Sequence, residues 1–315
     1  MENHFYKDKV CVVTGASSGV GFATTKLLLE EEAIVYAIDC KPVDIFGVIT
    51  IPCDLTNKES IDNAFLNIPD EIDCFFGAAN VSGLKADYYT TFTVNFIANK
   101  YITEEYLKVR MNPGGSICFV SSTAGNYWDK YSVEYRSYMK ANTWDKLITN
   151  LHKKADPDTV GVLAYPLSKR ALNYYMSEKA IEFGDRNIRV NTVLPAVSDT
   201  AMLEEFSADD AQYDAVPTGV ANRVPDPSEI AKPILFLNSD LASYISGVCL
   251  NIDYGNDSLI RLGKKRDRFD MKVNSKLFNV GFVQNQMMKQ LDGSSIESPE
   301  TTPDIEYDEN GIEIL

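Results

Sequence analysis

The chain has 315 residues, of which 45% are hydrophobic and 24% charged, which is enough to bury the core of one large domain or two ordinary ones. Its formal net charge of −15 argues against nucleic-acid binding and against binding to anionic membrane surfaces, because both demand a basic face. The N-terminal residues show no basic region followed by an apolar core, and no apolar run approaches the length of a membrane span. We therefore expect a cytoplasmic protein without membrane insertion.

Cysteine and histidine usage limits the chemistry further. The six cysteines stand singly without any Cys-x-x-Cys spacing, and we expect them to be reduced thiols. With only His4 and His152 available, a histidine-based metal site or a Ser-His-Asp triad is nearly excluded. We expect no metal.

A glycine-rich turn at residues 14–21 follows an apolar run at residues 10–13 and precedes a helical pattern. Its three glycines allow a tight turn and a close approach of a phosphate, and the new helix points free N–H groups at the anion. The pattern favours a nucleotide diphosphate, although a plain strand-to-helix turn remains the alternative. The residues expected to line this cofactor site are Gly15, Ser17, Ser18, Gly19, Val20 and Gly21.

Residues 34–38 read as a buried parallel strand, and Asp39 ends it. At this place in a dinucleotide-binding unit, an acid accepts hydrogen bonds from the adenosine ribose and repels a 2′-phosphate. Asp39 therefore favours NAD over NADP. The alternatives are a solvated strand-end carboxylate and, because Lys41 is near, some use of both cofactors.

Two further strands and their turns follow. Residues 47–51 predict a third strand, after which Asp54 and Leu55 precede a helix capped by Thr56 or Asn57. The Asp54 carboxylate either meets the adenine amino group or caps this helix. Residues 72–76 predict a fourth strand, followed by a small-residue turn at residues 77–80 where a cofactor could pass close to the backbone.

The middle of the chain holds a long helix and a fifth strand. Residues 90–110 read as helical, and Asn95 within them is unusual because an amide in mid-helix competes with the backbone. An exposed Asn95 is the simple alternative. Residues 116–120 predict a strand that ends at Ser122, a position where α/β sheets place their sites. The aromatic, helical segment at 123–164 is interpreted as a lid or, with preference, an oligomer contact.

Tyr165 and Lys169 are four residues apart and therefore share one face of the next helix. An ammonium beside the phenol is expected to lower the pKa of Tyr165 towards working pH and make it an acid/base. Residues 188–193 predict a sixth strand, and an apolar stretch from 202 to 213 is read as a substrate cover or a surface helix. A helix from Pro227 and a last strand at 248–252 complete the globule.

Regular patterning ends near Gly255. We expect a single domain over residues 1–255, with a helical insertion at about 123–164, and a C-terminal extension over 256–315. The extension carries no Lys or Arg from Asp292 onward, and we predict disorder from about that residue.

Taken together, residues 7 to about 255 resemble the short-chain dehydrogenase/reductase family. The glycine turn, Asp39 and the Asp54-Leu55 pair match the family's cofactor motifs. Asn95, Ser122, Tyr165 and Lys169 match its catalytic tetrad. The subgroup that it resembles is that of the bacterial NAD-dependent 3α-hydroxysteroid dehydrogenases/carbonyl reductases, which also carry an insertion before the catalytic tyrosine.

The resemblance implies an α/β fold with a Rossmann-type, doubly wound parallel sheet, NAD as cofactor and a homo-oligomer. It implies that Tyr165 exchanges the proton, that Lys169 holds the nicotinamide ribose, and that Ser122 bonds the substrate oxygen. Asn95 is then expected to hold a water linking Lys169 to solvent, and Ser198 and Thr200 to meet the carboxamide or pyrophosphate.

Two positions depart from the family pattern. The usual Asn-Ala-Gly turn after the fourth strand is Ala78-Ala79-Asn80, so Asn80 puts a side chain where glycine normally lets the cofactor pass. The usual Pro-Gly after the sixth strand is Pro195-Ala196, a milder change. Asn80 is therefore included among the expected cofactor contacts.

The resemblance favours interconversion of an apolar secondary alcohol and its ketone, with a hydroxysteroid of bile-acid type first among substrates. A carbonyl reductase or a sugar or terpene alcohol dehydrogenase on the same scaffold is the second interpretation. The third, from another class, is a nucleotide-sensing protein without turnover.

Overall fold

The computed structural model describes residues 4–155, 161–196, 219–221 and 223–265. Within them, a sheet of seven parallel strands has the order β3-β2-β1-β4-β5-β6-β7. This is the predicted Rossmann-type, doubly wound fold, in a single domain. The strands are β1 (Val10–Thr14), β2 (Ile34–Asp39), β3 (Ile49–Pro52), β4 (Ile72–Gly77), β5 (Met111–Val120), β6 (Arg189–Pro195) and β7 (Cys249–Ile252).

The strand order reverses between β1 and β4. The chain passes outward from β1 to β3 and then returns to add β4 on the other side of β1. Ligands of open α/β sheets bind at the carboxyl ends of the strands beside such a reversal. The turns after β1, β4 and β5 are therefore the place to look for a site.

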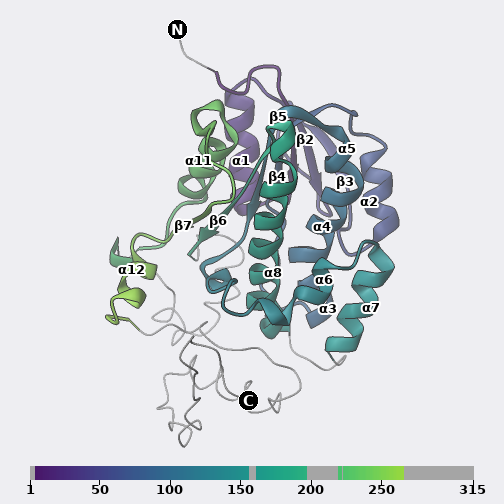
Figure 1. Ribbon diagram of the computed structural model, residues 1–315. Helices are drawn as coiled ribbons and strands as arrows, with labels where there is room; N and C mark the ends of the chain where they lie inside the picture. Colours follow the sequence, from purple (N-terminus) through teal and green to yellow (C-terminus); the bar gives the residue numbers. More distant parts are fainter. Residues whose placement is uncertain (1–3, 156–160, 197–218, 222, 266–315) are drawn as a thin grey trace, which may run out of the picture.

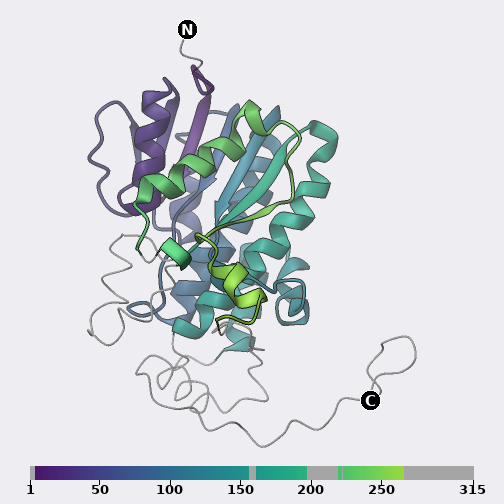
Figure 2. The same cartoon turned by 90° about the vertical axis from the view of Figure 1, so that its left-hand side faces the viewer.

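Helices cover both faces of this sheet (Figures 1 and 2). Helices α1 and α11 lie together on one face, and α3, α4 and α8 lie on the other. The helices are α1 (Gly19–Glu30), α2 (Lys58–Phe65), α3 (Tyr88–Phe92), α4 (Ala98–Ile102), α5 (Lys108–Arg110), α6 (Arg136–Met139), α7 (Trp144–Lys154), α8 (Gly161–Glu182), α11 (Pro227–Asn238) and α12 (Asn256–Arg261). Because both faces are covered, the central strands β1 and β4 are largely buried on both sides.

The sheet separates two hydrophobic clusters. On the α1–α11 face, Leu28 and Ile230 pack over the outward side chains of β1 and β4, such as Phe76. On the opposite face, a larger and more aromatic cluster includes Phe92 and Phe96. These layers fix the strand ends and hence the positions of the turns.

The predicted helix at 90–110 begins two residues earlier, at Tyr88, after Asp87 accepts a hydrogen bond from Thr90 N at 2.6 Å. It is not regular throughout. Two π-helical segments, η1 (Thr93–Ile97) and η2 (Thr103–Leu107), alternate with α3, α4 and α5. π turns are rare in proteins, and those that occur are often found at functional sites. Asn95 lies within the first of them.

The segment between β5 and α8 is built from short helices that pack on this long helix. Tyr138 of α6 packs on Phe92 at 4.7 Å between ring centroids, and Trp144 of α7 meets Tyr101 edge-on at 5.3 Å. Helix α8 begins at Gly161, so residues 161–164 belong to the helix that carries Tyr165.

A short helix follows Gly255, where no regular structure was predicted. In α12, Asp257 N donates to Asp253 Oδ2 at 2.8 Å, and Asn126 Nδ2 donates to Asp257 Oδ1 at 3.2 Å. The expectation that patterning ends at Gly255 is therefore wrong for residues 256–261. The predicted disorder from about 292 lies outside the described residues.

None of the helices in the described part of the chain is both long and apolar enough to cross a membrane. The same residues hold no cluster of His, Cys, Asp and Glu suited to a metal ion.

Candidate active site

The glycine turn after β1 is wedged against the turn after β4. A Cβ added to Gly15, whose φ is +74°, would lie 2.6 Å from the Cα of Ala79. A Cβ added to Gly21 would lie 2.1 Å from the carbonyl oxygen of Gly15. The turn therefore needs glycine for its own packing, before any ligand is considered.

Helix α1 starts at this turn with donors available for an anion. Ser18 is its N-cap residue, with extended backbone, and its side chain makes no capping hydrogen bond. The N–H groups of a first helical turn have no partner within the helix. Together with the helix dipole, they make this end of α1 suited to a phosphate.

Asp39, at the end of β2, reaches across to the same turn. Its Oδ2 accepts a hydrogen bond from Ser17 N at 3.0 Å, and its Oδ1 accepts one from Lys41 N at 2.9 Å. Each carboxylate oxygen retains a lone pair. Asp39 is thus fixed beside the glycine turn with capacity left for hydroxyl donors.

Asp54 is exposed and organises its own loop. Its Oδ1 accepts hydrogen bonds from Thr56 N at 2.9 Å and Thr56 Oγ1 at 2.7 Å. Of the two capping residues proposed for α2, Asn57 is the one that caps it, by accepting from Ser60 N. Leu55 packs against the aromatic cluster.

Ser122, Tyr165 and Lys169 come together at the carboxyl end of β5. Ser122 lies two residues beyond the last residue of the strand, and its Oγ accepts from Ala124 N at 3.2 Å. The Ser122 hydroxyl lies close enough to the Tyr165 phenol to lower its pKa. Lys169, one helical turn along α8, places Nζ 5.4 Å from the centroid of the Tyr165 ring. A hydroxyl, a phenol and an ammonium therefore share one site.

The electrostatics of this group differ from the expectation. Burial raises the pKa of Tyr165, and the hydrogen bond with Ser122 opposes that rise. Burial also lowers the pKa of Lys169 to about 7. The predicted lowering of the Tyr165 pKa by an adjacent ammonium is not found, because desolvation dominates and Lys169 Nζ bonds to Asn80 Oδ1 and Val120 O.

Asn95 is fully buried, which excludes the exposed alternative. Its Oδ1 accepts from Val81 N at 2.9 Å, and its Nδ2 donates to Val81 O at 3.0 Å and to Ser168 Oγ at 3.3 Å. The side chain thus clamps the segment after β4 to α8. Among the described residues, the hydrogen-bond partners of this side chain are Val81 and Ser168.

Asn80 supplies a contact that the sequence did not suggest. Its Oδ1 accepts a hydrogen bond from Lys169 Nζ. Its Nδ2 donates to Ala78 O at 3.1 Å and to Val120 O at 3.2 Å. The only sequence signal was the missing glycine at this position.

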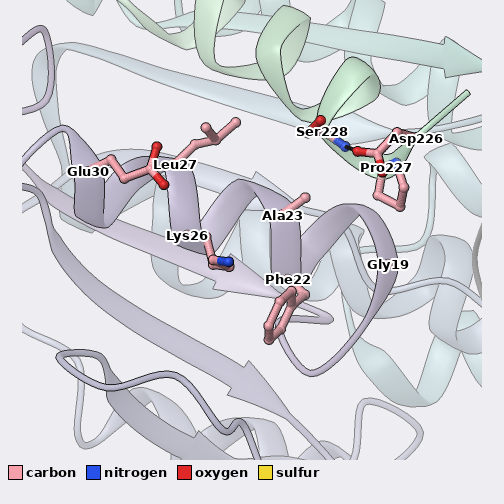
Figure 3. A pocket seen from close by; sticks show the side chains of 9 residues that line it. All are labelled: Gly19, Phe22, Ala23, Lys26, Leu27, Glu30, Asp226, Pro227 and Ser228. Atoms are coloured by element: carbon pink, nitrogen blue, oxygen red, sulfur yellow. Dashed lines mark hydrogen bonds between the residues drawn. The ribbon is translucent and has the colours of Figure 1, made fainter.

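Two expected cofactor residues, Ser198 and Thr200, lie outside the described residues, as does the apolar stretch at 202–213. A shallow pocket of about 390 Å³ between α1 and α11 touches the glycine turn only at Gly19 (Figure 3). It is open to solvent and includes none of Ser122, Tyr165 or Lys169. It is therefore not the site of the tyrosine chemistry.

Comparison with known proteins agrees with this geometry. Residues 9–141 match the family model described as short chain dehydrogenase, and residues 152–257 match that described as enoyl-(acyl carrier protein) reductase. The chain belongs to the short-chain dehydrogenase/reductase family. It is an oxidoreductase of the kind that acts on alcohol or ketone groups.

Its relatives within this family act on different molecules. The coniferyl-alcohol dehydrogenase of Pseudomonas sp. is 29% identical over 262 residues, which cover 79% of this chain and 96% of the relative. The 3alpha-hydroxysteroid dehydrogenase of Mediterraneibacter gnavus is 26% identical over 269 residues, covering 78% of this chain and 96% of the relative. The crystal structure of 3-alpha-hydroxysteroid dehydrogenase from Pseudomonas sp. B-0831 in complex with NADH superposes with a TM-score of 0.68, at 24% identity, covering 81% of this chain and 99% of that one.

Proposed function

We propose that this protein is an NAD-dependent dehydrogenase that interconverts a secondary alcohol and a ketone, with a hydroxysteroid of bile-acid type as its substrate. The observation that carries the proposal is the grouping of the Ser122 hydroxyl, the Tyr165 phenol and Lys169 near the carboxyl end of β5. A phenol that lies near a serine hydroxyl and an ammonium can exchange a proton with a substrate oxygen.

NAD is the cofactor, and the residues present fit it. The free N–H groups at the start of α1 suit a pyrophosphate, and Asp39 beside them retains lone pairs for ribose hydroxyls. An ammonium carries three donors, and among the described residues Lys169 Nζ spends two of them on Asn80 and Val120. The third donor is left for a ribose hydroxyl.

The chain's own residues handle the proton. When bound, NAD supplies hydride acceptance and donation at its nicotinamide ring. Ser122 donates a hydrogen bond to the substrate oxygen and holds it against the Tyr165 hydroxyl. Tyr165 takes the hydroxyl proton during oxidation and returns it during reduction. Lys169 favours the phenolate when charged, and its low pKa lets it pass a proton onward near neutral pH.

The substrate assignment is supported by the two hydroxysteroid dehydrogenases among the similar proteins and by the resemblance of the insertion. A second candidate, an aromatic alcohol, is favoured by the likeness to the coniferyl-alcohol dehydrogenase. We test both with a panel of 3α-hydroxysteroids, coniferyl alcohol and simple secondary alcohols, following NADH absorbance. A preference for coniferyl alcohol would overturn the steroid assignment, and no turnover on any substrate would favour a nucleotide sensor.

The catalytic assignment predicts that Tyr165→Phe loses most turnover, by at least about 100-fold, because the proton carrier is removed while the ring stays in place. NADH binding, measured by fluorescence titration, should survive, since the phenol hydroxyl is a small part of the cofactor contacts. Near-normal turnover in this variant would contradict the mechanism.

The setting of the enzyme is also a proposal. We place it in the cytoplasm, which is supported by six free cysteines, and as a homo-oligomer, which is supported by the family resemblance. Because the insertion packs on the helix at 88–110, it covers part of that helix. Size-exclusion chromatography with light scattering tests the oligomer, and a monomer would contradict it.

A further inference from the structure

Asn80 occupies the position at which the family's usual turn has glycine, and its side chain points to the catalytic lysine. We propose that Asn80 is a positioning residue of the active site, which holds the Lys169 side chain at a fixed place relative to Tyr165. The proposal rests on the proposed function only for what Lys169 does there. The contact itself is a property of the folded chain.

The orientation of the Asn80 amide is determined by its neighbours. An ammonium group only donates hydrogen bonds, so the oxygen Oδ1 must face Lys169 Nζ. The amide nitrogen then faces two acceptors, Ala78 O at 3.1 Å and Val120 O at 3.2 Å. Rotating the amide by half a turn would set donors against the ammonium and the oxygen against two carbonyls. The side chain therefore has a single favourable arrangement.

Lys169 Nζ is held from two strand ends at once. It donates to Asn80 Oδ1, just after β4, and to Val120 O, the last residue of β5, at 3.1 Å. Asn80 Nδ2 bonds the same Val120 carbonyl. Asn80, Val120 and Lys169 therefore form a closed set of hydrogen bonds that joins two neighbouring strands to α8. A glycine at 80 would leave Lys169 Nζ only the Val120 carbonyl among the acceptors in the described part of the chain.

The backbone beside Asn80 is itself held in place. Asn95 bonds both the N–H and the carbonyl of Val81, and it reaches Ser168 on α8. Asn95 thus acts on Lys169 indirectly, through the position of the turn that carries Asn80. The π turn at 93–97, which carries Asn95, and the asparagine at position 80 therefore both help to position Lys169.

The surroundings of Lys169 make an added acceptor important. Lys169 is fully buried, and burial alone lowers its pKa to about 7; no charged residue of the described part contributes to this shift. Tyr165 is the titratable neighbour on its own helix. From β5 and the segment after β4 it faces Val120 and Asn80, both neutral, and Ser121 Oγ bonds its backbone carbonyl. Asn80 Oδ1 is thus one of the few groups that stabilise the ammonium.

The experiment measures the pKa of Lys169 directly. Protein labelled with [ε-¹³C]lysine is titrated by NMR without cofactor, and the Lys169 signal is identified by its loss in Lys169→Met. Asn80→Gly removes the acceptor and should lower the pKa of Lys169 by about 1, since a hydrogen bond to a charged group is lost. Asn80→Asp puts a carboxylate at the same place and should raise it.

A matched control removes an asparagine at the other end of the sheet. Asn112→Ala deletes the bond to Asp73 Oδ1 and should leave the pKa of Lys169 unchanged. In turnover assays, the pH at which kcat is half-maximal should move down in Asn80→Gly and up in Asn80→Asp, with smaller changes in KM. If Asn80→Gly does not fold, the Asn80→Asp titration decides.

The outcomes separate this proposal from the function. An unchanged Lys169 pKa in both Asn80 variants would overturn the positioning role, even in an active dehydrogenase. A shifted pKa in a protein that turns over no alcohol would uphold the contact and overturn the proposed function.

Discussion

Lys169 is a buried cation whose described partners are neutral. Asn80 and Val120 accept its hydrogen bonds, and Tyr165 presents an aromatic ring. Hydrogen bonds to neutral acceptors offset only part of the free-energy cost of removing an ammonium from water. The pKa of Lys169 therefore falls. The site thus keeps the lysine close to the pH at which it changes charge, and this has a cost in stability.

That cost predicts a pH dependence. The pKa of Lys169 is about 7 in the folded chain against an ordinary 10.5, so between these values the unfolded chain binds a proton that the folded chain lacks. The free energy of unfolding should therefore rise with pH from about 7, at up to about 1.4 kcal/mol per pH unit from this group. Lys169→Met should remove this rise in urea unfolding between pH 6.5 and 9. Parallel pH profiles for the two proteins would contradict it.

Single residues also show where sequence patterns were sufficient. Asp39, Ser122, Tyr165 and Lys169 were placed correctly at strand ends or on one helix face, because strand ends and i, i+4 spacing are local properties. The pKa of Tyr165 was misjudged, since desolvation depends on everything packed around the group. The contact between Asn80 and Lys169 joins residues 89 positions apart and could not be read from spacing.

The glycine turn predicts a contrast between two glycine substitutions. Gly21→Ala would set a Cβ 2.1 Å from Gly15 O, so the turn must shift. We expect a loss of about 1–3 kcal/mol of unfolding free energy and weaker NADH binding, measured by thermal unfolding and fluorescence titration. Gly184→Ala is the control, because a Cβ added there has no neighbouring atom within 4 Å. It should change neither the free energy of unfolding nor NADH binding. Equal effects in the two variants would argue against the close approach of turn and helix.

Two buried tyrosines predict opposite effects of the same substitution. The Tyr138 hydroxyl has no hydrogen-bond partner among the described residues, whereas the Tyr175 hydroxyl donates to Glu104 Oε1 at 2.9 Å. Tyr138→Phe should raise the free energy of unfolding by about 1 kcal/mol, because it removes an unsatisfied buried group. Tyr175→Phe should lower it by about 1–3 kcal/mol. Guanidinium unfolding measures both, and a loss in Tyr138→Phe would indicate a partner for its hydroxyl.

Helices α6, α7 and α12 show what limits prediction at the level of elements. The insertion's helical character followed from its aromatic pattern, but its division into short helices depends on contacts with the helix at 88–110. Helix α12 was missed because six residues are too few to show a period. Its position depends instead on hydrogen bonds to Asp253 and Asn126.

At the scale of the molecule, α12 connects the last strand to the insertion. Asn126 lies beyond β5 and Asp257 beyond β7, and their side chains share a hydrogen bond of 3.2 Å. A double-mutant cycle with Asn126→Ala and Asp257→Ala should give a coupling energy of about 1 kcal/mol in thermal or urea unfolding. Strictly additive losses would show that the two segments are held independently.

The fold as a whole was predictable because strands and helices alternate through the chain and connections of parallel strands have one preferred hand. The irregular helix at 88–110 was not, although its extent was nearly right. Side-chain bonds to the backbone, such as those from Asn99 and Thr103, compete with the regular ladder in this helix, and no sequence period reveals that competition.

The two π turns also affect how this chain is compared with others by position. A turn that closes from residue i to i+5 contains one residue more than an α turn, so each acts as a one-residue insertion held inside a helix. Each residue of an α-helix is rotated by about 100° from the one before it. An ungapped sequence alignment with a regular helix would therefore assign Asn95 and the residues after it to the wrong helix face. Equivalent positions in this helix and in the helices of relatives must therefore be found by superposing the structures. The sequence alignment that follows should allow gaps at 93–97 and 103–107.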